Sequence, residues 1–290
     1  MPRVSIVLPC WNGERFLEQS IKSILNQSFK DWELIIVNDC STDNSPKIAE
    51  EYAKKDKRIR VIHNKVNKKL PATLNVGFSH AKGEYFTWTS DDNIAKPNWL
   101  SVLVDYLDKH SDVDMVSATM DYIDEDNNLL FKVYPQKTPL TLTYKCNVGA
   151  AFMYRKTIAD KIGGYDENTF CAEDYDYWCR IALNGVLKYI PDNIYMYRTN
   201  SQSLTALQKP KILEKTTYIQ KKYKQDFIKR FNLKYWDIVK IEYLSKNRKY
   251  RPAFVVLDTY KFLLRNISNL LFFWNKDLRQ KIYSKLQVQL

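Results

Sequence analysis

The chain of 290 residues has 45 lysines and arginines against 33 acidic residues, a formal net charge of +12 at pH 7. Hydrophobic residues make up 45% of it, so it has enough apolar material for a folded core and is not of the intrinsically disordered class. No uncharged run reaches 18 residues, so the sequence predicts no transmembrane helix.

The positive charge is concentrated toward the C-terminus. Residues 205–290 contain 20 lysines and arginines and 6 acidic residues, a net charge of +14, whereas residues 1–204 have a net charge of −2. Such an asymmetry indicates two parts of different character. We expect one domain at residues 1–204 and a basic helical extension at residues 205–290.

Short apolar runs alternate with amphipathic stretches over the first 120 residues. The runs that we predict to be strands are residues 4–9, 32–37, 60–63, 85–89 and 114–118. Between them, apolar residues recur with helical spacing, as in residues 14–27. This alternation predicts an α/β fold with a doubly wound, mainly parallel sheet.

The pattern changes after residue 121. The polar run at 124–128 predicts a hairpin turn, and the small residues within 147–154 predict a strand that a ligand can approach closely. A helix is predicted at 172–185, followed by two short strands. Those strands are expected at residues 187–190 and 194–197, and helices of the extension at 209–231, 235–246, 253–274 and 278–286.

Five cysteines are present, an odd number without a CxxC pair. This pattern supports neither a disulfide framework nor a zinc site, and it is typical of reduced thiols. We therefore expect a cytoplasmic protein.

Two adjacent acidic residues, Asp91 and Asp92, follow the strand predicted at 85–89, and Asp39 follows the strand at 32–37. The carboxyl ends of parallel strands meet at one edge, where open α/β sheets bind ligands. Adjacent carboxylates there suit a hard divalent cation that shares its other positions with substrate phosphates. The alternative is a solvated turn in which Asn93 caps a helix.

The sequence has neither GxGxxG after its first strand nor GxxxxGK[ST], which argues against a Rossmann dehydrogenase and a P-loop enzyme. Without a glycine cradle, a nucleotide diphosphate needs another counter-charge, which a cation on Asp91 and Asp92 would supply.

A second acidic pair, Glu173 and Asp174, begins the helix predicted at 172–185. A carboxylate that holds no metal could take a proton from an incoming hydroxyl group. The alternative is that both acids only stabilise the helix N-terminus. The helix dipole would lower the pKa of such a carboxyl and burial would raise it, so the direction stays open.

The order and spacing of several short motifs resemble the inverting family 2 glycosyltransferases of GT-A fold, over residues 3–204. The motifs are residues 4–12 (VSIVLPCWN), 21–27 (IKSILNQ), 36–43 (IVNDCSTD), 74–77 (LNVG), 81–85 (AKGEY), 91–92 (DD), 164–166 (GYD) and 173–176 (EDYD).

The resemblance implies a nucleotide-diphosphate sugar donor, expected to be a UDP-sugar, and a divalent metal cofactor, Mn²⁺ or Mg²⁺. In this reading Asp174 is the base that activates the acceptor hydroxyl, Glu173 supports it, and direct in-line attack inverts the anomeric centre. The remaining roles are the nucleobase and ribose for Pro9, Trp11 and Asp39, the ribose and metal for Asp91, the metal for Asp92, the donor sugar for Gly149, and the donor phosphates for Arg198.

Two positions depart from the family pattern. The usual acid two residues before Asp91 is Thr89, and the histidine often found two residues after Arg198 is Asn200. The metal shell would then rest mainly on Asp92 and the donor phosphates, which leaves the metal requirement open. Arg198 has the alternative of a surface arginine at a strand end.

The extension is both basic and aromatic. Such helices suit an anionic membrane surface, and a peripheral position on the inner face of the plasma membrane would fit a glycan or lipid-linked glycan acceptor in cell-surface polysaccharide synthesis. The alternative is a helical cap with a solvated basic face. No nucleic-acid partner is expected, because no recognised binding module is present.

Two other functions stay open at this point. One is a sugar-phosphate nucleotidyltransferase, although the segment after the first strand lacks the glycine-rich basic loop that such enzymes normally have. The other is a non-catalytic protein whose basic extension docks a membrane or polyanion.

Overall fold

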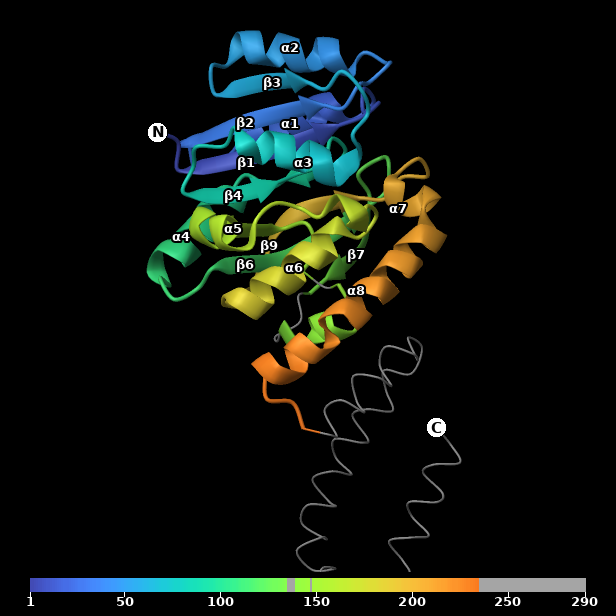
Figure 1. The fold of residues 1–290 in the computed structure, drawn as a ribbon. Coiled ribbons are helices and arrows are strands. Elements are labelled where there is room, and N and C mark those ends of the chain that lie inside the picture. The colour runs from blue at the N-terminus through green and yellow to red at the C-terminus, as the bar shows by residue number, and fades with distance from the viewer. Residues whose placement is uncertain (135–138, 147, 235–290) are drawn as a thin grey trace, which may run out of the picture. The chain divides into compact units, whose positions relative to one another are not determined.

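The computed structural model describes residues 1–134, 139–146 and 148–234 of the chain. Residues Met1–Lys234 form one compact unit (Figure 1). Asn147 and the helices predicted at 235–246, 253–274 and 278–286 lie outside the described residues, and the domain boundary expected at residue 204 stays a prediction. All five cysteines are free thiols.

Strands and helices alternate along the described chain. In order they are β1 (Val4–Cys10), α1 (Leu17–Leu25), β2 (Trp32–Asn38), α2 (Ser45–Lys55), β3 (Ile59–His63), α3 (Lys69–Ser79), β4 (Tyr85–Trp88), β5 (Ile94–Ala95), α4 (Trp99–Lys109), β6 (Met115–Ile123), β7 (Leu129–Val133), the 3-10 helix η1 (Pro139–Thr143), β8 (Phe152–Arg155), α5 (Lys156–Ile162), the 3-10 helix η2 (Glu167–Thr169), α6 (Glu173–Asn184), β9 (Leu187–Arg198), α7 (Leu204–Leu207) and α8 (Lys209–Arg230).

The strands form one sheet in the order β3-β2-β1-β4-β8-β6-β9-β5, with β7 added to β6 (Figure 1). β3, β2, β1 and β4 are parallel, as the alternating pattern predicts. Beyond β4 the sheet is mixed, because β8 runs antiparallel to both of its neighbours while β6 and β9 are parallel to each other. The α/β prediction is confirmed, and the carboxyl ends of β1, β2, β4, β6 and β9 lie on one edge.

Alternate residues of the buried strands contact different layers of helices, as the two-residue period of a strand requires. In β1, Ile6 and Leu8 belong to the core that also contains α1 and α4 residues. Val7 belongs to the core on the opposite face, with α3, α6 and α8 residues. In Figure 1, α3 and α6 accordingly cover the same face. With both faces covered, the rim is left for a ligand.

Two strands differ from the prediction. The strand expected at 147–154 is the short β8 (Phe152–Arg155). The two strands expected at 187–190 and 194–197 are one strand, β9, whose pairing with β6 skips Pro191 and Asp192. A proline has no N–H to donate to the ladder, so a bulge absorbs it while the strand continues.

The helix predicted at 209–231 is confirmed as α8. Its residues Ile219, Tyr223 and Phe227, four apart, are buried on one stripe of the helix. They belong to the same core as α6, so α8 packs on the helix that carries Asp174. Within the ranges that the structure covers, no helix is long and apolar enough to cross a membrane.

Candidate active site

Asp91 lies where the ends of β1 and β4 meet. These strands are parallel neighbours, so their carboxyl ends bring Trp11 and Gly13 next to the segment after Trp88. The Cys10 thiol and the Trp11 backbone N–H donate hydrogen bonds to the Asp91 carboxylate. A Cβ atom added to Gly13 would lie 2.2 Å from Asp91 Oδ2. Gly13 therefore leaves the space that this carboxylate occupies.

Asp92 is held by two neighbouring segments. Its Oδ1 accepts a hydrogen bond from the Ser90 hydroxyl, and its Oδ2 accepts one from Asn200 Nδ2 at 2.8 Å. Asn200 follows β9, so the loop that departs from the family pattern still reaches the acidic pair. A carboxamide at this position donates to Asp92 through its nitrogen.

Burial raises the pKa of both Asp91 and Asp92, and the charge of Asp92 raises that of Asp91 further. A divalent cation is the partner that would favour both ionised forms. In the described ranges no cluster of three or more histidine, cysteine or acidic side chains could hold a metal ion. A cation on this pair would therefore take its other ligands from water or from substrate phosphates, which suits Mg²⁺ and Mn²⁺ chemistry.

Asp39 holds the neighbouring loop. Its buried carboxylate accepts hydrogen bonds from Asn64 Nδ2 at 2.8 Å and from the backbone N–H groups of Lys68 at 2.8 Å and Lys69 at 2.9 Å. A carboxylate has about four acceptor positions, so one remains for a ligand. Trp11 is 58% exposed at the same rim, and Pro9 is buried within β1.

Glu173 and Asp174 begin α6 and face different partners. Glu173 Oε2 accepts the Cys171 backbone N–H at 2.8 Å, which fits the helix-capping alternative for this residue. Asp174 Oδ1 accepts the Tyr175 N–H at 2.7 Å, and the Cys146 thiol approaches Asp174 Oδ2 at 3.8 Å. Burial raises the pKa of both carboxyls, which settles the direction that the sequence left open.

Tyr197, near the end of β9, lies within electrostatic range of one acid of each pair. The Tyr197 phenol interacts electrostatically with both Asp92 and Asp174. Its ring packs against Tyr122 of β6 with 4.9 Å between centroids, and the Tyr122 phenol also interacts with Asp174. Asp92 and Asp174, 82 positions apart in the sequence, are thus brought to one region of the sheet edge.

Gly149 lies in the loop before β8 with a φ of +77°, a left-handed backbone that favours glycine. A Cβ atom there would lie 2.6 Å from Met120 Cε. The loop therefore packs tightly on the end of β6. The contact of Gly149 with the donor sugar stays a prediction.

Arg198 differs from its prediction. It is 1% exposed, and its guanidinium donates to five acceptors in the protein. These acceptors are the backbone carbonyls of Asp92, Asp124 and Glu125 and the side chains of Gln19 and Asn127. An arginine has five N–H donors, so none remains for a phosphate, and the geometry does not support the predicted donor contact. Arg198 instead ties the end of β9 to the Asp92 segment and the β6–β7 turn.

Sequence reasoning did not single out Gly13, Cys146 or Tyr197. Gly13 could not be found from its local sequence, because it leaves space for Asp91, which lies 78 positions later in the chain. Cys146 precedes the strand predicted at 147–154 and Tyr197 ends the strand predicted at 194–197, but nothing in their local sequence specifies an acidic neighbour.

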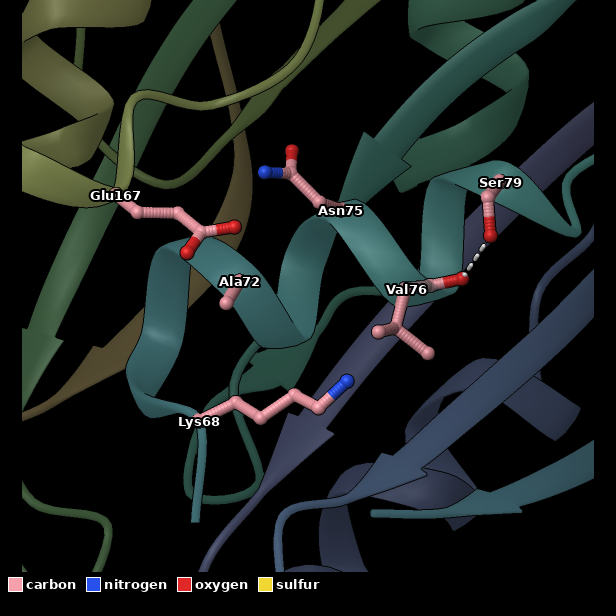
Figure 2. A pocket seen from close by; sticks show the side chains of 6 residues that line it. All are labelled: Lys68, Ala72, Asn75, Val76, Ser79 and Glu167. Atoms are coloured by element: carbon pink, nitrogen blue, oxygen red, sulfur yellow. Dashed lines mark hydrogen bonds between the residues drawn. The ribbon is translucent and has the colours of Figure 1, made fainter. Parts of the chain in front are cut away.

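A cavity of about 510 Å³ lies on the outer side of α3 (Figure 2). Its lining residues are Lys68, Ala72, Asn75, Val76, Ser79 and Glu167. None of the predicted site residues lines it, and the Ser79 hydroxyl is bonded to the Val76 carbonyl at 2.8 Å. The acidic pairs, and not this cavity, are therefore the candidate site.

The family model of Glycosyl transferase family 2 matches residues 5–163, more than half of the chain. The chain belongs to glycosyl transferase family 2. Membership confirms the resemblance and the GT-A fold, and it favours sugar transfer over the nucleotidyltransferase alternative.

Two curated relatives have descriptive names. The putative glycosyltransferase EpsE of Bacillus subtilis is 34% identical over 210 residues, which covers 70% of this chain and 75% of EpsE. The putative colanic acid biosynthesis glycosyl transferase WcaA of Escherichia coli is 27% identical over 271 residues, which covers 89% of this chain and 94% of WcaA.

Solved structures of TarS from S. aureus have the same fold. The crystal structure of TarS 1-349 in complex with UDP-GlcNAc superposes with a TM-score of 0.68 at 19% identity, covering 86% of this chain and 73% of that one. At this identity the likeness shows the fold alone.

Proposed function

We propose that this glycosyltransferase moves a hexosyl or N-acetylhexosaminyl group from a UDP-sugar to a hydroxyl group of a glycan or lipid-linked glycan, with inversion. The observation that carries the proposal is that the acids after β4 and the acids at the start of α6 lie near the same residue, Tyr197 at the end of β9, whose pKa the charges of Asp92 and Asp174 both raise. A donor held at Asp91 and Asp92 would then lie within reach of a base at Asp174.

The donor site is assigned to the β1, β2 and β4 ends. Trp11 offers an exposed ring for the nucleobase beside Pro9, and Asp39 keeps one acceptor position free. Asp91 is assigned to the ribose and Asp92 to the metal, with Gly149 beside the sugar. The UDP-GlcNAc complex of TarS, a protein of the same fold, supports a UDP-sugar.

A divalent cation, Mn²⁺ or Mg²⁺, fits the Asp91–Asp92 pair, whose burial raises the pKa of both carboxyls although the Arg198 charge lowers that of Asp92. When bound there, the ion would supply positive charge to the leaving diphosphate. The protein contributes by fixing the pair: Ser90 and Asn200 orient Asp92, while Cys10, Trp11 and the space at Gly13 orient Asp91.

Asp174 is assigned as the base. Its raised pKa moves it toward neutral pH, where a base is most effective while it stays ionised. It takes the proton of the acceptor hydroxyl, the acceptor oxygen bonds to the anomeric carbon, and the bond to the leaving UDP breaks on the opposite side. Glu173 acts indirectly, since its contact with the Cys171 N–H fixes the start of α6.

The acceptor is assigned to cell-surface polysaccharide synthesis, which the name of the WcaA relative supports. The chain is placed in the cytoplasm, with the basic extension against the inner face of the plasma membrane. Its +14 charge over residues 205–290 would attract anionic lipids.

Isothermal titration with UDP-sugars, with and without Mn²⁺, tests the donor site. We expect Mn²⁺-dependent binding that Asp92→Asn weakens by about tenfold or more, as is typical when a metal ligand shell is damaged. Asp126→Asn, an exposed acid of the β6–β7 turn, is the matched control and should bind normally. If both variants bound the UDP-sugar with equal affinity, Asp92 would not belong to the site. A glycoside product that retains the anomeric configuration of the donor would overturn the proposed inversion.

A further inference from the structure

Three lysines from two helices converge on one corner of the domain. Lys69 begins α3, and Lys211 and Lys215 lie in the first two turns of α8. The Lys69 and Lys211 ammonium groups lie 5.4 and 4.8 Å from the centroid of the same ring, Phe170. All three lysines interact electrostatically with the adjacent Cys171 thiol. Segments more than 100 residues apart thus deliver three positive charges to one place.

Among the residues that the structure describes, no acid forms an ion pair with these lysines. Lys222, further along α8, forms ion pairs with Asp166 and Asp176, whereas none of the three corner lysines is ion-paired with any described residue. Of the acids near the corner, Glu173 is buried and accepts the Cys171 N–H, and Asp39 accepts the backbone N–H groups of Lys68 and Lys69. Glu214, between Lys211 and Lys215 on α8, forms no ion pair with any residue that the structure describes. Like charges gathered around one ring repel each other unless an anion offsets them, and such a corner attracts anions from solution.

The corner is next to the proposed base. Phe170 and Cys171 come immediately before α6, whose second residue is Asp174. α8, which supplies two of the three lysines, packs on α6, the helix that begins with Glu173 and Asp174. An anion bound here would therefore lie beside the start of that helix.

We propose that Lys69, Lys211 and Lys215 bind a phosphate group of the acceptor. The proposal rests on the proposed function, because it takes Asp174 to mark the acceptor side, and it narrows the acceptor to a phosphate-bearing glycan or lipid. Lysine suits this task as a compact charge with three donors on a flexible stem, which can follow a phosphate as the sugar reaches the base.

Isothermal titration with inorganic phosphate at low ionic strength tests the corner. The variant is Lys211→Ala/Lys215→Ala, and the control is Lys221→Ala/Lys229→Ala, which removes the same charge from exposed positions on the same helix. Lys69 is left intact because its N–H holds Asp39. We expect the corner variant to weaken phosphate binding about tenfold, equivalent to about 1.4 kcal/mol, and the control less than about twofold.

Equal losses in both variants would mean that only overall charge matters, and no loss in either would mean that phosphate binds elsewhere; each result overturns the proposal. Titration of the same samples with UDP distinguishes a failure of this proposal from a failure of the proposed function. Unchanged UDP binding with lost phosphate binding supports both, and absent UDP binding in the unmodified protein counts against the proposed function alone.

Vesicles distinguish the source of the phosphate. Sedimentation with phosphatidylcholine vesicles, with and without phosphatidic acid, is compared between the two double variants. A deficit of the corner variant on phosphatidic acid assigns the phosphate to a lipid. A deficit with inorganic phosphate alone assigns it to a soluble acceptor. Matching behaviour of the two variants in both assays overturns the proposal.

Discussion

Two opposing effects set the pKa of Asp174. Burial raises its pKa, while hydrogen bonds from the Tyr175 N–H and the Cys146 thiol favour the charged form and lower it. The backbone donor cannot be removed by substitution, but the thiol can. Substitution of Cys146 is therefore a way to change the pKa of the proposed base, Asp174.

Cys146→Ala should move the acidic limb of the kcat/KM profile to higher pH. Deleting a donor to the carboxylate destabilises its charged form, so its pKa rises, and the active, deprotonated form is lost at a higher pH than before. Cys146→Ser, which keeps a donor, should restore much of the original profile. The measurement is transfer rate against pH, and an unmoved acidic limb in the alanine variant would show that the thiol does not act on the base.

Gly13 contributes space and not a functional group. Gly13→Ala would put a methyl group 2.2 Å from Asp91 Oδ2, which forces the carboxylate to move. We expect metal-dependent UDP binding to weaken by about tenfold or more, measured by titration.

Gly163→Ala is the control for that substitution. Gly163 has a φ of +78° with no atom near its Cβ position, so alanine there should cost stability, about 1 kcal/mol, without touching the donor site. Equal donor binding in Gly13→Ala and the unmodified protein would mean that Asp91 can shift without consequence.

For single residues, the sequence predicts the positions of those that directly follow a strand of the sheet. Asp39 and Asp91 lie at the same rim because both follow parallel strands of one sheet. Arg198 could not be assigned this way. Its five acceptors come from α1, the Asp92 segment and the β6–β7 turn, and no local pattern reveals that they converge.

Among the elements, α6 and α8 are joined by a buried ion-pair network next to the site. Asp176 has 0% exposure, pairs with Arg180 at 2.8 Å and Lys222 at 2.9 Å, and accepts the Tyr223 hydroxyl at 2.8 Å. It lies two residues after Asp174, so the seating of α8 fixes the helix that presents the base.

Asp176→Asn should lower the free energy of unfolding by about 3 kcal/mol, because it leaves Arg180 without its carboxylate partner and Lys222 with only its longer pair to Asp166. Urea unfolding measures this change. Asp160→Asn, whose pair with Lys156 is exposed, is the matched control and should change stability by less than about 1 kcal/mol. Comparable values for the two variants would show that the network does not secure α8.

The parallel strands β1 to β4 and the long helix α8 match the prediction, whereas β8 and the interrupted strand β9 differ from it. The helix predicted at 209–231 is α8, in which Ile219, Tyr223 and Phe227 are buried together. The two strands predicted at 187–190 and 194–197 are one strand, because pairing with β6 on both sides of the bulge at Pro191 carries β9 through.

At the scale of the whole molecule, the topology of the sheet determines where the site residues lie. Alternating strands and helices predicted the α/β class and the parallel half from β3 to β4. They could not predict that β8 enters antiparallel between β4 and β6, because strand order depends on long-range pairing. That insertion leaves β6 and β9 running in the direction of β4, so Tyr122 and Tyr197 reach the same rim as Asp91 and Asp92.

The central claim is that the donor site and the base lie at the same edge of the sheet. Its most direct test is to measure UDP binding and sugar transfer separately in the Asp174→Asn variant. Asparagine has nearly the same shape but cannot accept the hydroxyl proton, so transfer should fall by about 10²-fold or more while the UDP dissociation constant stays within about twofold. Both quantities are measured on the same preparation, by product formation and by titration with UDP in the presence of Mn²⁺. Unchanged turnover in Asp174→Asn would contradict the account.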